Sequence, residues 1–248
     1  MTPGKFGRCG SAVLMVLFAS ACSREPNSPA DARSEDREHA IEELNESTAV
    51  VSRMLESDEI PRSRRERARC VVVVPSLLSG GLILGAKRGS GVVTCRTTAG
   101  WSAPAFVTIA GGSAGFQAGV QSADIVMLVM SDRGKEQLFR SSFELGADAS
   151  AAAGPVGRDV QASTDEKLTA EILSYARSRG LFAGVQLSGA VMKQDSALTF
   201  ALYGGSPAGH ALLTGAVPAP REANTFLDQV RKAFPSDEAD STASAQRR

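Results

Sequence analysis

The sequence predicts an α+β fold: a single domain over residues 38–234, with a largely antiparallel, glycine-rich, barrel-like sheet flanked by N- and C-terminal helices. Apolar residues recur at helical spacing near both ends of the chain, whereas β-branched runs punctuated by glycine fill the middle. The strands follow one another without regular intervening helices, which favours antiparallel pairing over a succession of βαβ units. A span of this length supports a single core.

The N-terminal part of the domain is expected to form two helices followed by strands. Residues 39–54 carry apolar side chains at helical spacing, and acids cluster early in the segment, as suits a helix N-terminus. Pro61 follows a break and suits the first position of a second, short helix. Strands are expected over the β-branched residues 70–75 and over residues 91–97, 101–110 and 122–130.

The C-terminal part is expected to mix short strands and helices. Strands are predicted over residues 143–153 and 181–192, and helices over residues 135–141, 195–203 and 221–234. Residues 168–173 fit either a helix or a strand. The last helix is the clearest, because one face carries Phe226, Leu227, Val230 and Phe234.

The first 21 residues have the order of an export signal. Lys5 and Arg8 supply a positive start, an apolar run covers residues 12–19, and the small residues Ser20 and Ala21 follow. A helix that spans a bilayer needs about 20 apolar residues, so the run is too short to cross. It suits the hydrophobic region of a signal peptide better than a buried helix or strand.

Residues 17–22, LFASAC, resemble the lipobox of bacterial lipoproteins, in which cleavage leaves Cys22 as the first residue, carrying acyl chains. Ala19 stands where leucine is usual, so ordinary cleavage near Ala21 is the alternative. Several acyl chains would anchor the chain firmly, because each buried methylene contributes roughly 0.8 kcal/mol. Together with the non-acidic Ser23, the pattern predicts an exported protein of the bacterial cell envelope, lipid-anchored on the periplasmic face of the outer membrane.

Composition bears on partners and cofactors. Removal of residues 1–21 takes away two of the 27 basic residues and leaves 25 against 27 acids, a net charge of −2. Such a chain has no overall field that gathers nucleic acid. Two separated histidines and the remaining cysteines show no ligand spacing, so neither a metal nor another cofactor is expected. Cys70 and Cys95 either form a disulfide in an oxidising compartment or pack as buried thiols.

The chain outside the domain is polar. Residues 22–37 are rich in Pro, Ser, Asp and Arg and are expected to be a tether. Residues 235–248 are expected to be a disordered tail.

Several segments in the middle and late chain resemble the SYLF domain family, a lipid-binding, actin-patch-type domain. They are GSGVV at 89–93, GWSAPAF at 100–106, IAGGSAGFQAG at 109–119, LGADA at 145–149, AGPVGR at 153–158 and SYARSRGLFAGV at 174–185. The resemblance covers roughly residues 68–234. It implies binding to anionic phospholipids, of the phosphoinositide type in eukaryotic members, and bacterial relatives resemble exported lipoproteins. A bacterial envelope lacks actin, so actin binding is not carried over, and protein partners are unknown.

Basic side chains are the natural candidates for contact with acidic headgroups, because each Lys or Arg near an anionic surface contributes about 1 kcal/mol. The candidate lipid-binding residues are Arg62, Arg64, Arg65, Arg67, Arg69, Lys87, Arg88, Arg177 and Arg179. For the run at 62–69 the alternative is a solvated helix face. For Arg158, Arg177 and Arg179 it is a structural ion pair, for instance with Asp148. Trp101 is either a membrane-interface anchor or a core residue.

Two other functions compete with lipid binding. Residues 111–115, GGSAG, satisfy the G-x-S-x-G pattern of a serine hydrolase, with Asp132 and His210 in the order of that fold. A hydrolase elbow joins a strand to a helix, whereas the residues after Ser113 read as glycine-punctuated and then strand-like, so we expect no enzyme. The third interpretation is a structural envelope protein that uses the domain for protein contacts.

Overall fold

The computed structural model describes residues 29–81, 84–114, 120–156, 170–178 and 180–235. The helices are α1 Pro29–Ser57, α2 Arg62–Arg67, α3 Asp132–Leu138, α4 Ser196–Tyr203, α5 Gly209–Leu213 and α6 Asn224–Ala233, the last preceded by the 3₁₀ turn Arg221–Ala223. The strands are β1 Cys70–Gly81, β2 Leu84–Thr97, β3 Gly100–Trp101, β4 Ala105–Ala114, β5 Val120–Val129, β6 Ser142–Glu144, β7 Ala151–Ala153, β8 Ile172–Ser178, β9 Leu181–Gly184 and β10 Ala190–Gln194.

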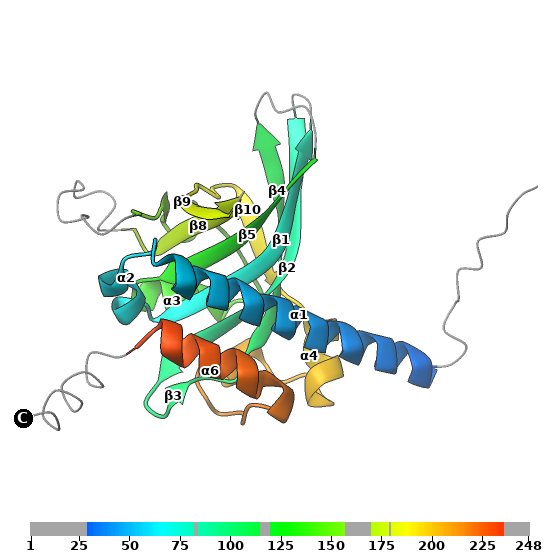
Figure 1. The fold of residues 1–248 in the computed structure, drawn as a ribbon. Helices are drawn as coiled ribbons and strands as arrows, with labels where there is room; N and C mark the ends of the chain where they lie inside the picture. The colour runs from blue at the N-terminus through cyan, green and yellow to red at the C-terminus, as the bar shows by residue number, and fades with distance from the viewer. Residues whose placement is uncertain (1–28, 82–83, 115–119, 157–169, 179, 236–248) are drawn as a thin grey trace, which may run out of the picture.

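The strands form one sheet, which curls into a half-barrel (Figure 1). The strand order is β6-β10-β4-β2-β1-β5-β8-β7, with β3 beside β2 and β9 beside β8. Within the described ranges only β7 and β8 pair in parallel. The predicted α+β class and largely antiparallel sheet are therefore confirmed.

Both faces of the sheet are covered where β1 begins, which explains the continuous valine run there. Val71 and Val73 face the core under α1 and α6, whereas Val72 and Val74 face a second core on the other side. In Figure 1, α1 crosses the sheet diagonally and α6 lies beside it. The face that carries α1 and α6 is called the helix face from here on.

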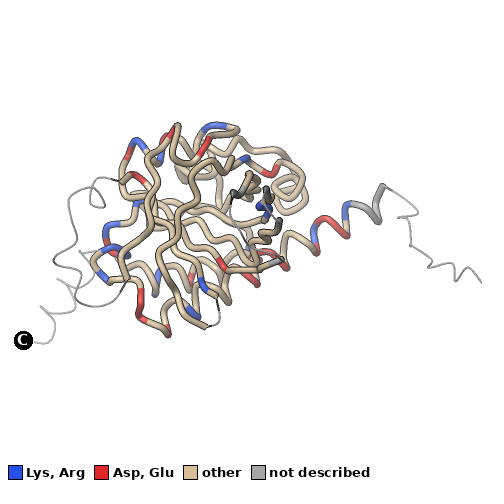
Figure 2. Tube along the Cα trace, turned by 90° about the horizontal axis from the view of Figure 1, so that it is seen from above, with Lys and Arg blue, Asp and Glu red and all other residues tan. Residues whose placement is uncertain are grey.

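Helix α1 begins at Pro29, ten residues before the predicted start, so residues 29–37 of the predicted tether are helical. Arg37 explains part of the extension, because its guanidinium donates to the carbonyl oxygens of Ala201 and Leu202 at the end of α4 and pairs with Glu222. The first turns of α1 project from the body, and basic and acidic residues follow one another along them (Figure 2).

The described residues of the glycine-rich stretch 79–90, for which no strand was predicted, belong to strands β1 and β2. Beyond the body, β1, β2, β4 and β5 continue as a four-stranded projection, which we call the β arm (Figure 1). We define the arm by the described residues 77–81, 84–90, 108–114 and 120–123. At its base, residues 108–111 of β4 still pair with β10, and Leu77 and Ile109 belong to the second core. Glycine is required at the base of the arm, because a Cβ on Gly91 would lie 2.3 Å from the carbonyl oxygen of Val73.

Several element boundaries differ from prediction. The strand expected over 143–153 is two short strands, β6 and β7, and the one expected over 181–192 is β9 and β10, with Gly189 at a φ of +79° just before β10. Helix α3 starts three residues early, because the Ser131 side chain accepts from the Gly134 amide and caps it. The helices predicted at 195–203 and 221–234 are confirmed.

The structure also bears on the cysteines, the termini, membrane spans and metal sites. Cys70 and Cys95 are bonded as a disulfide between directly paired residues of β1 and β2. The predicted signal peptide, Cys22 and the tail 236–248 lie outside the described residues. Among the described helices, none is long and apolar enough to cross a membrane. The same part of the chain contains no group of three or more His, Cys, Asp or Glu side chains placed to hold a metal ion.

Candidate anion-binding surface

The arginine-rich run forms α2, and this helix divides its side chains between the interior and solvent. Arg64 and Arg65 are buried. The Arg65 guanidinium donates to the carbonyl oxygen of Ile60 at 3.1 Å, to that of Ala233 at 2.8 Å and to Asp58 Oδ1 at 3.0 Å. Arg65 therefore satisfies a carbonyl at the end of α6 and fixes α2 against it. Arg65 therefore has a structural role, and Arg64 is buried, so neither residue is available to a ligand at the surface.

The other arginines of the run are exposed but are not gathered. Arg62 pairs with Glu66 at 2.5 Å, and Arg69 pairs with Asp132 at 3.4 Å. Arg67 is exposed. A helix with 3.6 residues per turn points successive side chains in different directions, so the run is divided between the interior, where Arg64 and Arg65 lie, and solvent. The structure therefore does not bring the five arginines into one patch.

A second basic group lies where the sheet emerges from under α1. Asp124 on β5 accepts from Arg53 of α1 at 2.9 Å and lies 4.0 Å from Arg177 of β8. The backbone amide of Ser76 also donates to Asp124, at 3.3 Å. The Asp124 side chain is 15% exposed, and both arginines are half-buried with their Nε atoms inside. Arg177 is thus in an ion pair, with Asp124 rather than Asp148.

Arg53 did not stand out in the sequence, because it is a single arginine in a helix. The signal that would have found it is its position near the C-terminal end of the predicted helix, combined with the register of β5 and β8. That register pairs Asp124 directly with Arg177 and so points both side chains to the helix face. Arg158 and Arg179 lie outside the described residues.

The β arm adds a row of exposed residues on the same face. Register pairs Ala110 with Arg88, Arg88 with Leu78, and Leu78 with Ser122, so these four residues form one row across β4, β2, β1 and β5. All four are exposed. Ser122 and Asp124 are two residues apart on β5, so both point to the helix face. Arg88 and Arg177 are three strands apart, a lateral distance of about 15 Å.

Lys87 lies on the opposite face of the arm, because neighbouring residues of a strand alternate in direction. It is half-buried, and its direct partners are Ser79 and Gly111. Arg88 is therefore the charged residue that the arm presents on the helix face.

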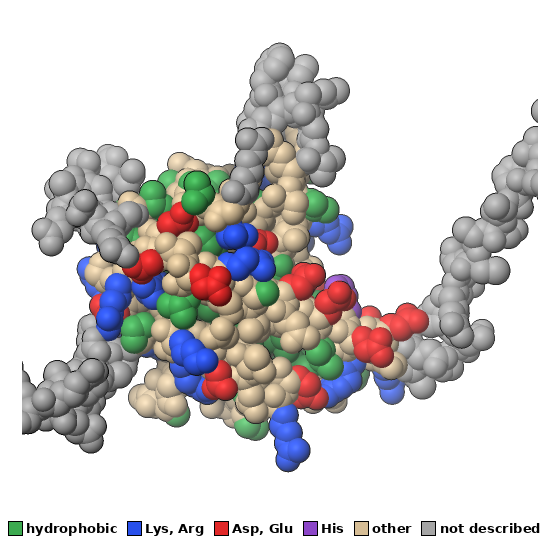
Figure 3. All heavy atoms as spheres, in the orientation of Figure 1, with side chains coloured by type: hydrophobic (Ala, Val, Ile, Leu, Met, Phe, Trp, Pro, Cys, Tyr) green, Lys and Arg blue, Asp and Glu red, His purple; other side chains and the backbone are tan. Residues whose placement is uncertain are grey.

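The charges are unevenly distributed along the chain. Residues 67–123 contain no acid, although they hold Arg67, Arg69, Lys87, Arg88 and Arg96. On the view in Figure 3 the described part of the arm is mostly uncharged, whereas acidic side chains gather along the projecting end of α1. The strands of the arm carry no carboxylate before Asp124, which is engaged by Arg53. The exposed Glu144 of β6 lies in the same row as Arg88, three strands away.

Trp101 is part of the core rather than an exposed anchor. Its ring is buried, packs edge-on against Phe234 at 5.8 Å and lies 4.7 Å below the guanidinium of Arg96. Arg96 in turn donates to the carbonyl oxygens of Ala68 and Phe234, which fixes the end of α6 to the sheet.

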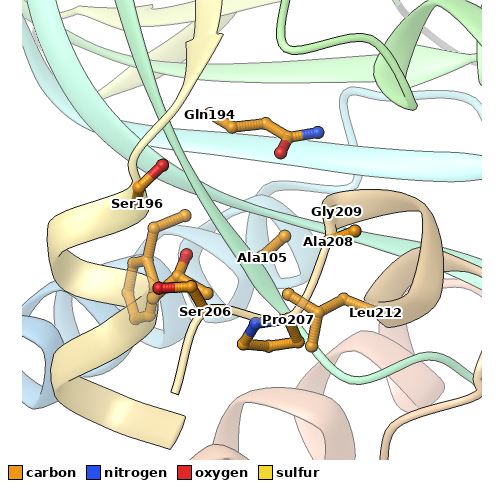
Figure 4. Close-up of a pocket in the computed structure, with 10 residues that line it drawn as sticks. Ala105, Gln194, Ser196, Ser206, Pro207, Ala208, Gly209 and Leu212 are labelled. Carbon is orange, nitrogen blue, oxygen red and sulfur yellow. The ribbon is translucent and has the colours of Figure 1, made fainter. Parts of the chain in front are cut away.

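A cavity of about 150 Å³ lies between β4, α4 and α5 (Figure 4). Its polar lining is the Gln194 amide and the hydroxyls of Ser196, Thr199 and Ser206. No charged residue lines it, so it offers nothing that would bind an acidic headgroup.

The arrangement does not fit the hydrolase alternative. Ser113 is the penultimate residue of strand β4, where its backbone pairs with Gly85, and the next described element is strand β5, whereas a hydrolase elbow leads into a helix. Asp132 pairs with Arg69, and the His210 ring packs against Phe139 at 4.7 Å. The three residues are therefore placed by contacts unrelated to a triad.

Comparison with known proteins identifies the family. The Ysc84 family model, described as "Las17-binding protein actin regulator", matches residues 110–233. SH3 domain-containing YSC84-like protein 1 of Rattus norvegicus is 32% identical over 202 residues, which are 81% of this chain and 59% of the rat protein. Protein YSC84 of Saccharomyces cerevisiae is 30% identical over 172 residues, 68% of this chain and 36% of the yeast protein. The chain thus spans less than two thirds of the length of these relatives. It belongs to the Ysc84, or SYLF domain, family.

Proposed function

We propose that this protein binds membranes that contain anionic phospholipids, through basic side chains on the helix face of its sheet. The observation that carries the proposal is the placement of Arg53, Arg88 and Arg177 on one face, next to an arm with no acidic residue. Binding is electrostatic and non-catalytic. The family resemblance supports a lipid ligand and does not specify the headgroup.

The expected strength is modest. Each Lys or Arg near an anionic surface contributes about 1 kcal/mol, and the contribution falls with ionic strength. Asp124 offsets part of the charge of Arg53 and Arg177, so Arg88 is the strongest single contributor. Modest affinity is sufficient for a protein already held at the bilayer, because an anchor at Cys22 raises the local concentration of the domain at the surface.

The anchor is a separate part of the proposal. Acylation of Cys22 would hold the chain in a bacterial envelope, at the periplasmic face of the outer membrane. Replacement of Cys22 by Ser is expected to abolish metabolic labelling of the protein with a fatty acid such as palmitate. Labelling that persists in the Cys22→Ser protein would show that the anchor is elsewhere.

Protein contact is the second candidate function, favoured by the family's description as Las17-binding. In this chain the same exposed arginines would then meet acidic side chains of a partner rather than lipid phosphates. The vesicle experiment below separates the two, because it contains no partner protein.

The test is cosedimentation of the mature chain, carrying Cys22→Ser, with vesicles of phosphatidylglycerol and phosphatidylcholine or of phosphatidylcholine alone. We expect binding to the anionic vesicles, weakened by salt, and none to the zwitterionic ones. Arg88→Gln is expected to weaken binding about fivefold, the equivalent of about 1 kcal/mol. Arg231→Gln, which removes an exposed charge from α6, is the matched control and leaves binding unchanged. Equal binding to both vesicle types would refute the proposal.

A further inference from the structure

Leu78 is a large apolar side chain in an unusual place. It is 52% exposed, although it lies on β1, an inner strand of the sheet. Its direct partners on either side are Arg88 and Ser122. A leucine placed in the middle of a sheet face normally packs under a helix or a second sheet, and no described helix covers the helix face of the arm (Figure 1).

The residues around Leu78 are small, so its side chain stands out from the face. The same row continues from Ala110 to Val191 on β10, and the next row towards the tip contains Gly112, Ala86, Gly80 and Val120. None of these side chains is long enough to cover a leucine. The result is one protruding apolar side chain beside one exposed guanidinium on an otherwise flat surface.

The backbone N–H and C=O groups of the inner strands of the arm are paired within the sheet. β1 pairs with β2 and β5, and β2 pairs with β1 and β4, so both strands are bonded on both edges. Backbone groups that are satisfied internally can approach lipid without the cost of unpaired N–H and C=O groups.

We propose that the helix face of the β arm is a membrane-docking surface, with Leu78 among the upper acyl chains and Arg88 on lipid phosphate. The inference rests on the proposed function and adds which element enters the bilayer interface. Arg88 is well suited to this place, because a long basic side chain can keep its charge at the headgroups while its stem lies along apolar surface.

Charge favours a bilayer over a second copy of the chain as the occupant. Lys87 and Arg88 are the charged residues of the described arm, and both are positive. Two arms that met face to face would bring their arginines together, whereas an anionic bilayer attracts them. The described arm also has no acid with which a second arm's arginine would pair.

The experiment places a fluorophore at the surface. In the mature chain with Cys22→Ser, the two remaining cysteines form the disulfide, so Leu78→Cys supplies a single free thiol for an environment-sensitive dye. Thr225→Cys, at an exposed site on α6, is the matched control. Addition of phosphatidylglycerol-containing vesicles is expected to shift the emission at position 78 to the blue and to leave position 225 unchanged. Leu78→Gln, without dye, is expected to weaken vesicle binding about fivefold at an unchanged melting temperature.

The outcomes test the docking surface and the proposed function separately. Protein that pellets with anionic vesicles, without a blue shift at position 78, would overturn the docking surface and leave the proposed function standing. Protein that stays in the supernatant would overturn both. A blue shift in the absence of vesicles that grows with protein concentration would show that a second copy occupies the arm, against the proposal.

Discussion

A buried acid between α1 and α4 gives the fold a pH dependence that can be measured. Glu43 lies on the inner side of α1 and is 6% exposed. Its Oε1 atom has no hydrogen-bond partner among the described residues. Burial raises its pKa from 4.5 to about 7, and the negative charges of Glu46, Asp195 and Glu42 add to the effect. The folded protein therefore holds a proton on Glu43 that the unfolded chain releases near pH 4.5.

The sign and size of the effect follow from proton binding. Between pH 4.5 and 7 the folded state binds the Glu43 proton and the unfolded state does not, so the free energy of unfolding falls as the pH rises. The interval is roughly 2.5 pH units, and each unit corresponds to about 1.4 kcal/mol, which gives a loss of about 3 kcal/mol. The contribution is complete below pH 4.5 and is gone above pH 7.

The perturbation is Glu43→Gln, which keeps the size of the side chain and removes its titration. Urea unfolding from pH 4.5 to 8.5 measures the free energy of unfolding of both proteins. The variant is expected to gain about 3 kcal/mol relative to the wild type between the two ends of this range. Glu38→Gln, at an exposed site on the same helix, is expected to follow the wild type throughout. Parallel profiles for Glu43→Gln and wild type would refute the reasoning.

Two further predictions concern the sheet. Gly91→Ala is expected to destabilise the protein by about 3 kcal/mol, because the added Cβ would lie 2.3 Å from the backbone oxygen of Val73; Gly112→Ala, with nothing within 4 Å, is the neutral control in the same unfolding assay. Replacing Cys70 and Cys95 by Ala is expected to lower the free energy of unfolding by about 3 kcal/mol, because the bond closes a loop with a sequence separation of 25. A reductant should then affect the wild type and not the variant.

The parts of the fold that the sequence predicted are those whose side chains carry a pattern. The strand β1 can be predicted because burial on both faces requires a continuous apolar run. The helix α6 can be predicted because burial along one stripe requires apolar residues at helical spacing. The β arm shows no such pattern. Glycine and alanine are too small to show by polarity which face of a sheet they are on. Strand pairing in the arm depends on residues that are distant in the chain, such as Ala86 and Gly112.

The candidate surface was predicted only in part, for a related reason. Arg88 and Arg177 were found as basic residues in recognisable segments, but their common face follows from the register of strands far apart in sequence. Arg64 and Arg65 were predicted to bind lipid as part of the dense arginine run, with a solvated helix face as the alternative, and both interpretations place them at the surface. The buried position of Arg65 depends on the carbonyl oxygen of Ala233, which lies 168 residues further along the chain.

The distribution of charge also explains how a chain without positive net charge, zero for the full sequence and −2 after the predicted removal of residues 1–21, would dock on an anionic surface. All the acids lie outside residues 67–123, and a group of them, Glu35, Asp36 and Glu38, is on the first turns of α1. An anionic bilayer therefore repels one end of α1 and attracts the arm, so the field sets the orientation even though the net charge is unfavourable. Exposed charges more than about 10 Å apart are screened at 0.1 M salt. The attraction between the arm and the bilayer therefore depends on the charges of the arm and not on the net charge of the chain. Removing acids from α1 would then raise the net charge with little gain in binding, whereas removing the single charge of Arg88 would weaken it.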